Sequence, residues 1–152
     1  MTCMSARRLR DNVERWLTHE NYSFKDTKTD EDSFRISIKH VGSFGNNLEI
    51  FEPKNQPNIL VLGAKCPLKN NQNARYLRLT DSERENFEKK VADYCYSIQA
   101  IHRFLDENGK KIVGVYAVLD KEEQLNQVDF GETMQKVIEM SDKTTQYLMK
   151  TF

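Results

Sequence analysis

The chain has 152 residues, a length that suits one domain with a hydrophobic core that needs neither disulfides nor metal. Its 23 basic and 23 acidic residues cancel, so no overall field attracts nucleic acid or an anionic membrane surface. No apolar run approaches the ~18 residues needed to span a bilayer. These totals predict a cytoplasmic protein with no nucleic-acid or membrane partner.

The first expected element is an amphipathic helix from about Ser5 to His19 or Glu20. Ser5 has a side chain suited to the N-cap, and apolar residues then recur every three or four positions. This spacing places them on one face of the helix. The expected buried stripe consists of Leu9, Val13, Trp16 and Leu17.

Three strands are expected next, over Phe34–Val41, Leu48–Glu52 and Ile59–Lys65. The first alternates apolar and polar residues, which is typical of an antiparallel strand with one buried face. The third opens with four consecutive apolar residues and should end at Pro67. We therefore expect it to be buried on both faces, at the centre of the sheet. The segment that follows, Lys69–Arg78, is expected to be a polar loop.

A helix over Thr80–Ile101 is the element around which we expect the chain to be organised. Thr80 and Glu83 have the spacing of a capping box, in which each side chain satisfies a free backbone donor at the helix start. No Pro or Gly interrupts the run. Its apolar stripe consists of Phe87, Val91, Tyr94, Ile98 and Ile101.

The rest of the chain reads as a hairpin followed by a helix. Asn108-Gly109 separates two strand-like runs, His102–Glu107 and Lys110–Leu119, and both turn residues tolerate the positive φ that a tight hairpin needs. The last helix should begin between Asn126 and Asp129 and run nearly to Phe152. Its expected inner face consists of Phe130, Met134, Val137, Ile138, Thr145 and Leu148.

No residue pattern points to catalysis, a cofactor or a metal. The histidines, His19, His40 and His102, are far apart and lack the spacing of a ligand motif. No pair of acidic residues stands out as acid and base. We therefore expect a protein that is not an enzyme, with no cofactor, no catalytic residue and no metal site.

The cysteines are expected to be free thiols in a reducing compartment. Cys3, Cys66 and Cys95 are odd in number and form no close pair. Cys95 lies on the inner half of the central helix and reads as a small core residue. Cys66, which precedes Pro67 at a strand end, is expected to be the more exposed thiol.

The order helix, three strands, helix, hairpin, helix resembles the type III secretion chaperone-like fold, which small intracellular archaeal and bacterial families share. The similarity runs from about Ser5 to Phe152 and rests on topology alone. It is carried by the strands Phe34–Val41, Leu48–Glu52 and Ile59–Lys65, the helix Thr80–Ile101 and the Asn108-Gly109 turn. For a secretion chaperone, this resemblance implies a non-enzymatic homodimer that holds an extended segment of a partner protein.

The fold expected is one α+β domain over residues 1–152. It should have a five-stranded, antiparallel, twisted sheet with three helices, in the order α-β-β-β-α-β-β-α. The expected function is that of a protein-binding, chaperone-like or adaptor module, homodimeric, whose partner protein the sequence does not identify. The alternative is a small ligand-binding protein or enzyme with a site assembled between sheet and helices. A convergent polar pocket would favour the alternative, whereas an exposed apolar patch or open strand edge would favour the binding module.

The outer face of the central helix is the expected protein-interaction surface. At 100° per residue Tyr96 points away from Phe87, and an exposed aromatic of this kind can anchor an interface. A lone exposed tyrosine without a role is the competing interpretation. The surface consists of Lys89, Ala92, Asp93, Tyr96 and Ala100.

Overall fold

A computed structural model describes residues 6–27 and 29–151; Cys3, the N-cap predicted at Ser5, and Phe152 lie outside this range. The elements in chain order are α1 (Ala6–His19), β1 (Lys25–Asp26), β2 (Asp32–Val41), β3 (Asn46–Pro53), β4 (Leu60–Pro67), α2 (Asn70–Leu77), α3 (Asp81–Ser97), β5 (Ile101–Glu107), β6 (Lys110–Leu119), a 3-10 turn (Glu122–Gln124) and α4 (Gln127–Thr151).

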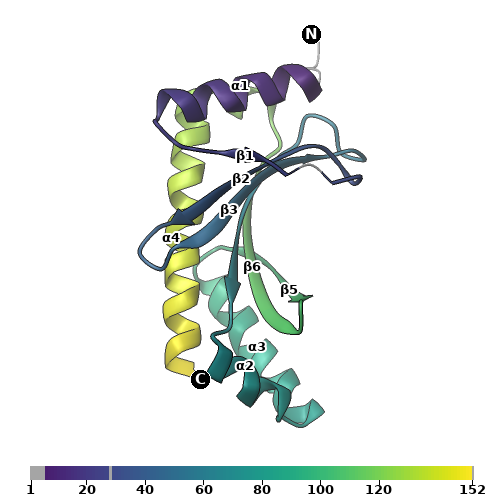
Figure 1. The fold of residues 1–152 in the computed structure, drawn as a ribbon, viewed down its shortest axis with the longest axis vertical. Coiled ribbons are helices and arrows are strands. Elements are labelled where there is room, and N and C mark those ends of the chain that lie inside the picture. Colours follow the sequence, from purple (N-terminus) through teal and green to yellow (C-terminus); the bar gives the residue numbers. More distant parts are fainter. Residues whose placement is uncertain (1–5, 28, 152) are drawn as a thin grey trace.

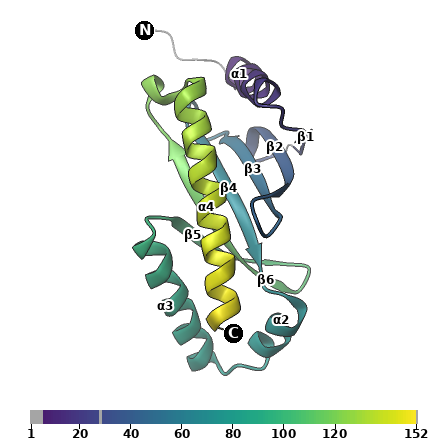
Figure 2. The same ribbon diagram turned by 90° about the vertical axis from the view of Figure 1, so that its left-hand side faces the viewer.

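The strands form one antiparallel sheet in the order β1-β2-β3-β4-β6-β5, and all four helices lie on one side of it. Helix α4 crosses β4 and β6 diagonally, α1 lies at one end, and α2 and α3 lie at the other (Figures 1 and 2). Among the described residues, no helix lies on the opposite side of the sheet (Figure 1). We call that side the open face.

The expected α+β class and antiparallel sheet are confirmed, but the sheet has six strands and the fold has four helices. The extra strand, β1, has only two residues, which pair with Ile36 and Ser37 of β2. Two residues are too few to leave an alternating pattern in the sequence.

The extra helix, α2, occupies the segment expected to be a polar loop. Two of its polar residues, Gln72 and Asn73, face inward and bind backbone. Gln72 Nε2 donates to the carbonyl of Leu148 at 3.1 Å. The amide of Asn73 donates to the carbonyl of Gly109 and accepts from the backbone N–H of Lys111, both at 2.9 Å. Polar side chains that serve as internal anchors look solvent-facing in a sequence, which explains the wrong prediction.

The predicted apolar stripes of α1 and β2 are confirmed. Leu9, Val13 and Leu17 are fully buried and Trp16 is 5% exposed, with its ring 5.2 Å from that of Phe130. The inward residues of β2 are also buried; they are Phe34, Ile36 and Ile38.

The central position of β4 is confirmed, but its burial on both faces is not. Leu60, Leu62 and Ala64 are buried against α4, whereas Val61 and Lys65 are only half-buried on the open face. The apolar run suggested two covered faces, but the helices cover only one.

The capping box of α3 is confirmed, while the predicted helix end is wrong. Glu83 N–H donates to Thr80 Oγ1 at 3.2 Å, and Thr80 N–H donates to Glu83 Oε1 at 2.9 Å. The helix ends at Ser97, and Gln99 then takes a φ of 58° that turns the chain into β5. Ile101 therefore starts a strand and is 54% exposed instead of closing the helical stripe.

The Asn108-Gly109 hairpin is confirmed, with φ values of 53° and 76° at the two turn residues and β5 paired to β6. The last helix also starts where predicted, and Phe130, Met134, Val137 and Leu148 are buried. Among the described residues, no helix has the length and apolar character that a bilayer crossing requires.

Candidate functional site

The structure brings only part of the predicted interaction surface together. Tyr96 is 85% exposed on the outer side of α3, with Lys89 and Asp93 exposed and Ala92 half-buried beside it. Ala100 does not belong to this surface. It lies beyond the end of α3, its N–H donates to the carbonyl of Cys95, and it is 7% exposed within the core.

The expected exposure of Cys66 is wrong. Its thiol is fully buried under α4, where Sγ lies 3.6 Å from the carbonyl of Ser141, and burial raises its pKa to about 11. Cys95 is buried as predicted, and burial raises its pKa to about 11 as well. Across residues 6–27 and 29–151, His, Cys, Asp and Glu side chains form no group of three suited to a metal ion.

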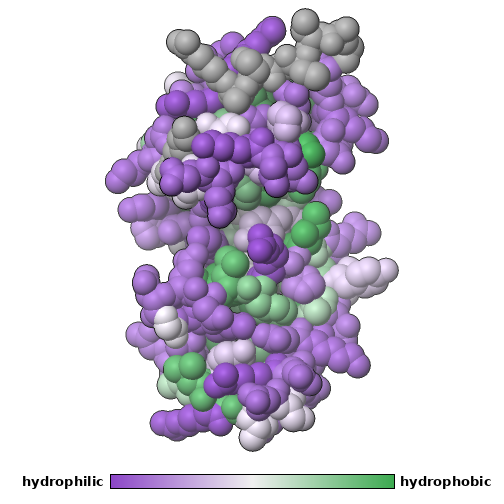
Figure 3. Space-filling model, turned by 90° about the vertical axis from the view of Figure 1, so that its right-hand side faces the viewer, coloured by the Kyte–Doolittle hydropathy of each residue, from purple (hydrophilic) through white to green (hydrophobic). Residues whose placement is uncertain are grey.

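A groove of about 960 Å³ hollows the open face, and hydrophobic side chains gather near the middle of that face, among hydrophilic ones (Figure 3). The strand register explains the arrangement. Phe51, Val61 and Val118 are cross-strand partners on β3, β4 and β6. Ile101 of β5 pairs with Tyr116, two residues before Val118 on β6. We call Phe51, Val61, Val118 and Ile101 the apolar row.

Charged side chains next to the apolar row form a continuous chain of ion pairs. Arg35 of β2 binds Asp32 at 2.7 Å and also Glu49 of β3. Lys65 of β4 binds Glu49 at 3.1 Å and Glu107 of β5 at 2.6 Å. The pairs therefore link four strands across the open face.

Arg35 also connects this network to the apolar row. Its guanidinium carbon lies 4.0 Å from the centre of the Phe51 ring, a cation–π contact. The contact fixes one end of the apolar row against the charged network.

Tyr116 of β6 lies flat on the sheet at the centre of the groove. Its ring covers two glycines: a Cβ at Gly63 would be 2.5 Å from its Cε1, and a Cβ at Gly114 would be 2.8 Å from its Cζ and nearer still to the hydroxyl. Any larger residue at either position would displace the ring. The register places Gly114 between Lys65 and Arg103, so the hydroxyl lies between the backbone positions of those two residues.

Burial raises the pKa of the Tyr116 phenol, while the nearby charges of Lys65, Arg103 and Arg35 oppose that rise. The hydroxyl is therefore protonated at neutral pH and able to donate a hydrogen bond. In the described part of the chain it makes no hydrogen bond, and Arg103 makes no ion pair.

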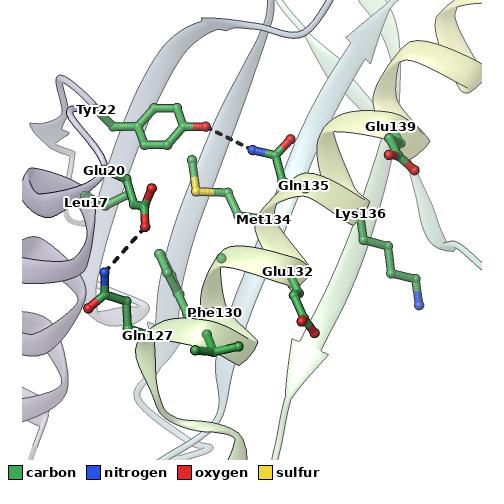
Figure 4. Close-up of a pocket in the computed structure, with 12 residues that line it drawn as sticks. Leu17, Glu20, Tyr22, Gln127, Phe130, Glu132, Met134, Gln135, Lys136 and Glu139 are labelled. Atoms are coloured by element: carbon green, nitrogen blue, oxygen red, sulfur yellow. Dashed lines mark hydrogen bonds between the residues drawn. The ribbon is translucent and has the colours of Figure 1, made fainter.

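A second hollow of about 610 Å³ lies between the end of α1 and the start of α4 (Figure 4). Its polar groups bind one another: Gln135 Nε2 donates to Tyr22 Oη at 3.2 Å, and Gln127 Nε2 donates to Glu20 at 3.4 Å. Its apolar wall includes Leu17, Phe130 and Met134, which pack α1 against α4. The groove on the open face, which holds donors without partners, is therefore the better candidate site.

The residues of this groove were not predicted to form a site. Alternation along β2 correctly placed Arg35 on the face opposite the core. It could not show that Glu49, Lys65 and Glu107 lie beside it, because that depends on the pairing of four strands. The glycines at 63 and 114 were the available signal, since a glycine inside a strand often marks a close approach.

A crystal structure of an uncharacterized protein from Methanothermobacter thermautotrophicus is similar to this fold, with a TM-score of 0.75. The match covers 95% of this chain and 99% of that chain at 11% sequence identity, so it supports the fold alone. No curated protein matches the sequence. A family model described as "Uncharacterized conserved protein (DUF2299)" matches residues 9–148, and the chain therefore belongs to that family.

Proposed function

We propose that the protein is a non-enzymatic binding module, chaperone-like in fold, that holds an extended segment of a partner protein in the groove on the open face. The observation that carries this proposal is the apolar row. Ile101 is 54% exposed and Val118 is 37% exposed on the open face, where Ile101 pairs with Tyr116, two residues before Val118 on the neighbouring strand. A contiguous exposed apolar surface with a charged border is typical of a protein-binding site.

The pattern along β5 favours an extended occupant. Ile101, Arg103 and Leu105 face the groove at alternate positions, so they repeat every ~6.6 Å. Side chains i, i+2 and i+4 of an extended segment repeat at the same distance. Strand β5 is also the edge of the sheet, which leaves the groove accessible from that side.

The resemblance to the type III secretion chaperone-like fold supports the same function, since it implies a protein that holds an extended partner segment. The alternative, a small ligand-binding protein or enzyme with a site between sheet and helices, has less support. That side of the sheet is filled by the core, in which Leu48, Ile50 and Leu62 are fully buried. The groove carboxylates Asp32, Glu49 and Glu107 are each bound to a cation.

A selection from random dodecapeptides displayed on phage tests the proposal. We expect the protein to enrich peptides with apolar residues at alternate positions. A synthetic copy of an enriched peptide should bind Val118→Asp about tenfold or more weakly by fluorescence anisotropy, because the substitution places a charge in the apolar row. Val128→Asp is the matched control, since Val128 is 68% exposed beside the second hollow.

Equal binding by wild type and Val118→Asp would contradict the proposal. So would a loss in Val128→Asp alone, which would place the peptide in the hollow between α1 and α4. A selection that enriches no peptide would contradict it as well.

A further inference from the structure

We propose that the groove contains a carboxylate-binding subsite formed by Arg103 and Tyr116, which selects an acidic side chain in the bound segment. This inference rests on the proposed function and adds the chemistry by which the partner is chosen. The subsite lies at the centre of the open face, where β4, β6 and β5 meet at Lys65, Gly114 and Arg103.

The position of the Tyr116 hydroxyl is set by the backbone below it. Glycine at 63 and 114 leaves room for the ring to lie against the sheet, and the hydroxyl rests over Gly114. Lys65 and Arg103 flank Gly114 as its cross-strand partners, with Cβ atoms about 4.5–5.5 Å from that position. The phenol donor therefore lies over a backbone position that an arginine and a lysine flank, and the charges of Lys65, Arg103 and Glu107 all act on its pKa.

These three donors differ in their availability. Lys65 forms ion pairs with Glu49 and Glu107, so these two carboxylates already neutralise its charge. Throughout residues 6–27 and 29–151, nothing pairs with the Arg103 guanidinium or accepts from the Tyr116 hydroxyl. An acceptor placed between them would receive a forked guanidinium contact and a phenol hydrogen bond, as a carboxylate does.

The charge of the groove favours a monoanion over a phosphate. Five acidic residues and four basic residues line it, so a second negative charge on the ligand would meet a surface that is already slightly acidic. The acidic residues are Asp30, Glu31, Asp32, Glu49 and Glu107, and the basic ones are Arg35, Lys54, Lys65 and Arg103.

The neighbours of Arg103 indicate an internal side chain of the segment instead of a chain terminus. Ile101 and Leu105 flank Arg103 along β5, and both line the groove. A bound segment that contacts both Ile101 and Leu105 extends past Arg103 in each direction, so its acidic residue is not at a chain end. The complementary pattern in the partner is an acidic residue with apolar residues two positions before and two positions after it.

Selection from the same dodecapeptide library, run against charge variants, tests the subsite. Wild type should enrich peptides with the apolar–x–acidic–x–apolar pattern. Arg103→Glu should lose this preference and favour a basic residue at the central position. Lys143→Glu, which makes the same kind of charge change on an exposed position of α4, should select the same peptides as wild type.

Synthetic peptides then separate the two donors. Replacing the central Glu by Gln should weaken binding to wild type about tenfold and leave binding to Arg103→Gln unchanged. Tyr116→Phe keeps the ring on its glycines and should weaken binding of the Glu peptide only. If wild type and Arg103→Glu select the same groove-binding peptides, the subsite is wrong although the binding module stands. If no peptide binds the groove, the proposed function fails and the subsite fails with it.

Discussion

At the scale of single residues, the shape of the groove depends on the absence of side chains at Gly63 and Gly114. A tyrosine side chain on a β-strand normally stands roughly perpendicular to the sheet and can adopt more than one χ1 rotamer. Here two neighbouring positions without side chains let the Tyr116 ring lie against the backbone, half-buried, with its hydroxyl over Gly114, the cross-strand partner of Lys65 and Arg103. The position of the hydroxyl is therefore encoded by two residues that contribute no functional group of their own.

Gly63→Ala should destabilise the protein by ~1–3 kcal/mol, because the new methyl group occupies the space of the Tyr116 ring. The cost should largely disappear when Tyr116 is replaced by Ala, since the clash is then gone. Urea unfolding of the two single variants and the double variant measures this coupling. Additive costs would show that the ring does not depend on the glycine.

The two buried thiols make stability depend on pH in the alkaline range. A thiol in the unfolded chain ionises near pH 9, whereas Cys66 and Cys95 in the folded protein have pKa values of about 11. Between these values the unfolded state releases protons that the folded state keeps. The free energy of unfolding should therefore fall as the pH rises from about 9 to 11.

Urea unfolding at a series of pH values checks this expectation. Lysines and tyrosines titrate in the same range, so the informative comparison is with the Cys66→Ala/Cys95→Ala double variant. Its stability should decline less steeply above pH 9. Parallel declines in the two proteins would show that the thiols do not carry the effect.

At the scale of elements, the sequence predicted well those segments whose burial depends on apolar residues. Helix α1, strand β2, the β5–β6 hairpin and α4 all follow the spacing of their apolar side chains. Helix α2 did not, because Gln72 and Asn73 are buried by hydrogen bonds to backbone on α4 and the hairpin. The end of α3 was also missed, because positive φ at a non-glycine residue such as Gln99 leaves no mark in the sequence.

Trp16→Ala tests the packing of α1 on α4. Trp16 is 5% exposed and its ring lies 5.2 Å from that of Phe130, so its removal leaves a cavity between the two helices. We expect a loss of ~3–5 kcal/mol in the free energy of unfolding. The native emission of Trp16, the only tryptophan, should lie at shorter wavelength than that of the unfolded chain. Identical emission would contradict its burial.

At the scale of the whole molecule, the functional surface arises from a sheet covered on one side only. The groove residues come from five strands and the loops beside them, and the ion pairs Lys65–Glu107 and Arg35–Glu49 join positions 42 and 14 residues apart. Apolar periodicity reports which side of each strand is buried, but it does not report which strands are neighbours. Three features of the groove therefore could not be predicted from the sequence, because they depend on the strand register. They are the charged network, the apolar row and the position of Tyr116 over Gly63 and Gly114.

The predicted homodimer can be tested at the same scale. If the outer side of α3 forms the interface, wild type should be a dimer and Tyr96→Glu a folded monomer, because the substitution buries an unpaired charge. Light scattering after size exclusion measures both. Val128→Glu, at a position on α4 that is 68% exposed, should leave the dimer intact. A monomeric wild type, or a dimeric Tyr96→Glu protein, would remove this side of α3 from the account.

We expect the open face, and not the helical side, to hold the partner segment. Methyl-labelled NMR spectra, recorded while a selected dodecapeptide is added, test it most directly. Binding should shift the methyl signals of Val61, Val118, Ile101 and Leu105, which line the groove. The methyl signals of Val13 in α1 and Val137 in α4, which are fully buried on the helical side, should not shift. Shifts confined to the hollow between α1 and α4, or to the outer side of α3, would contradict the claim.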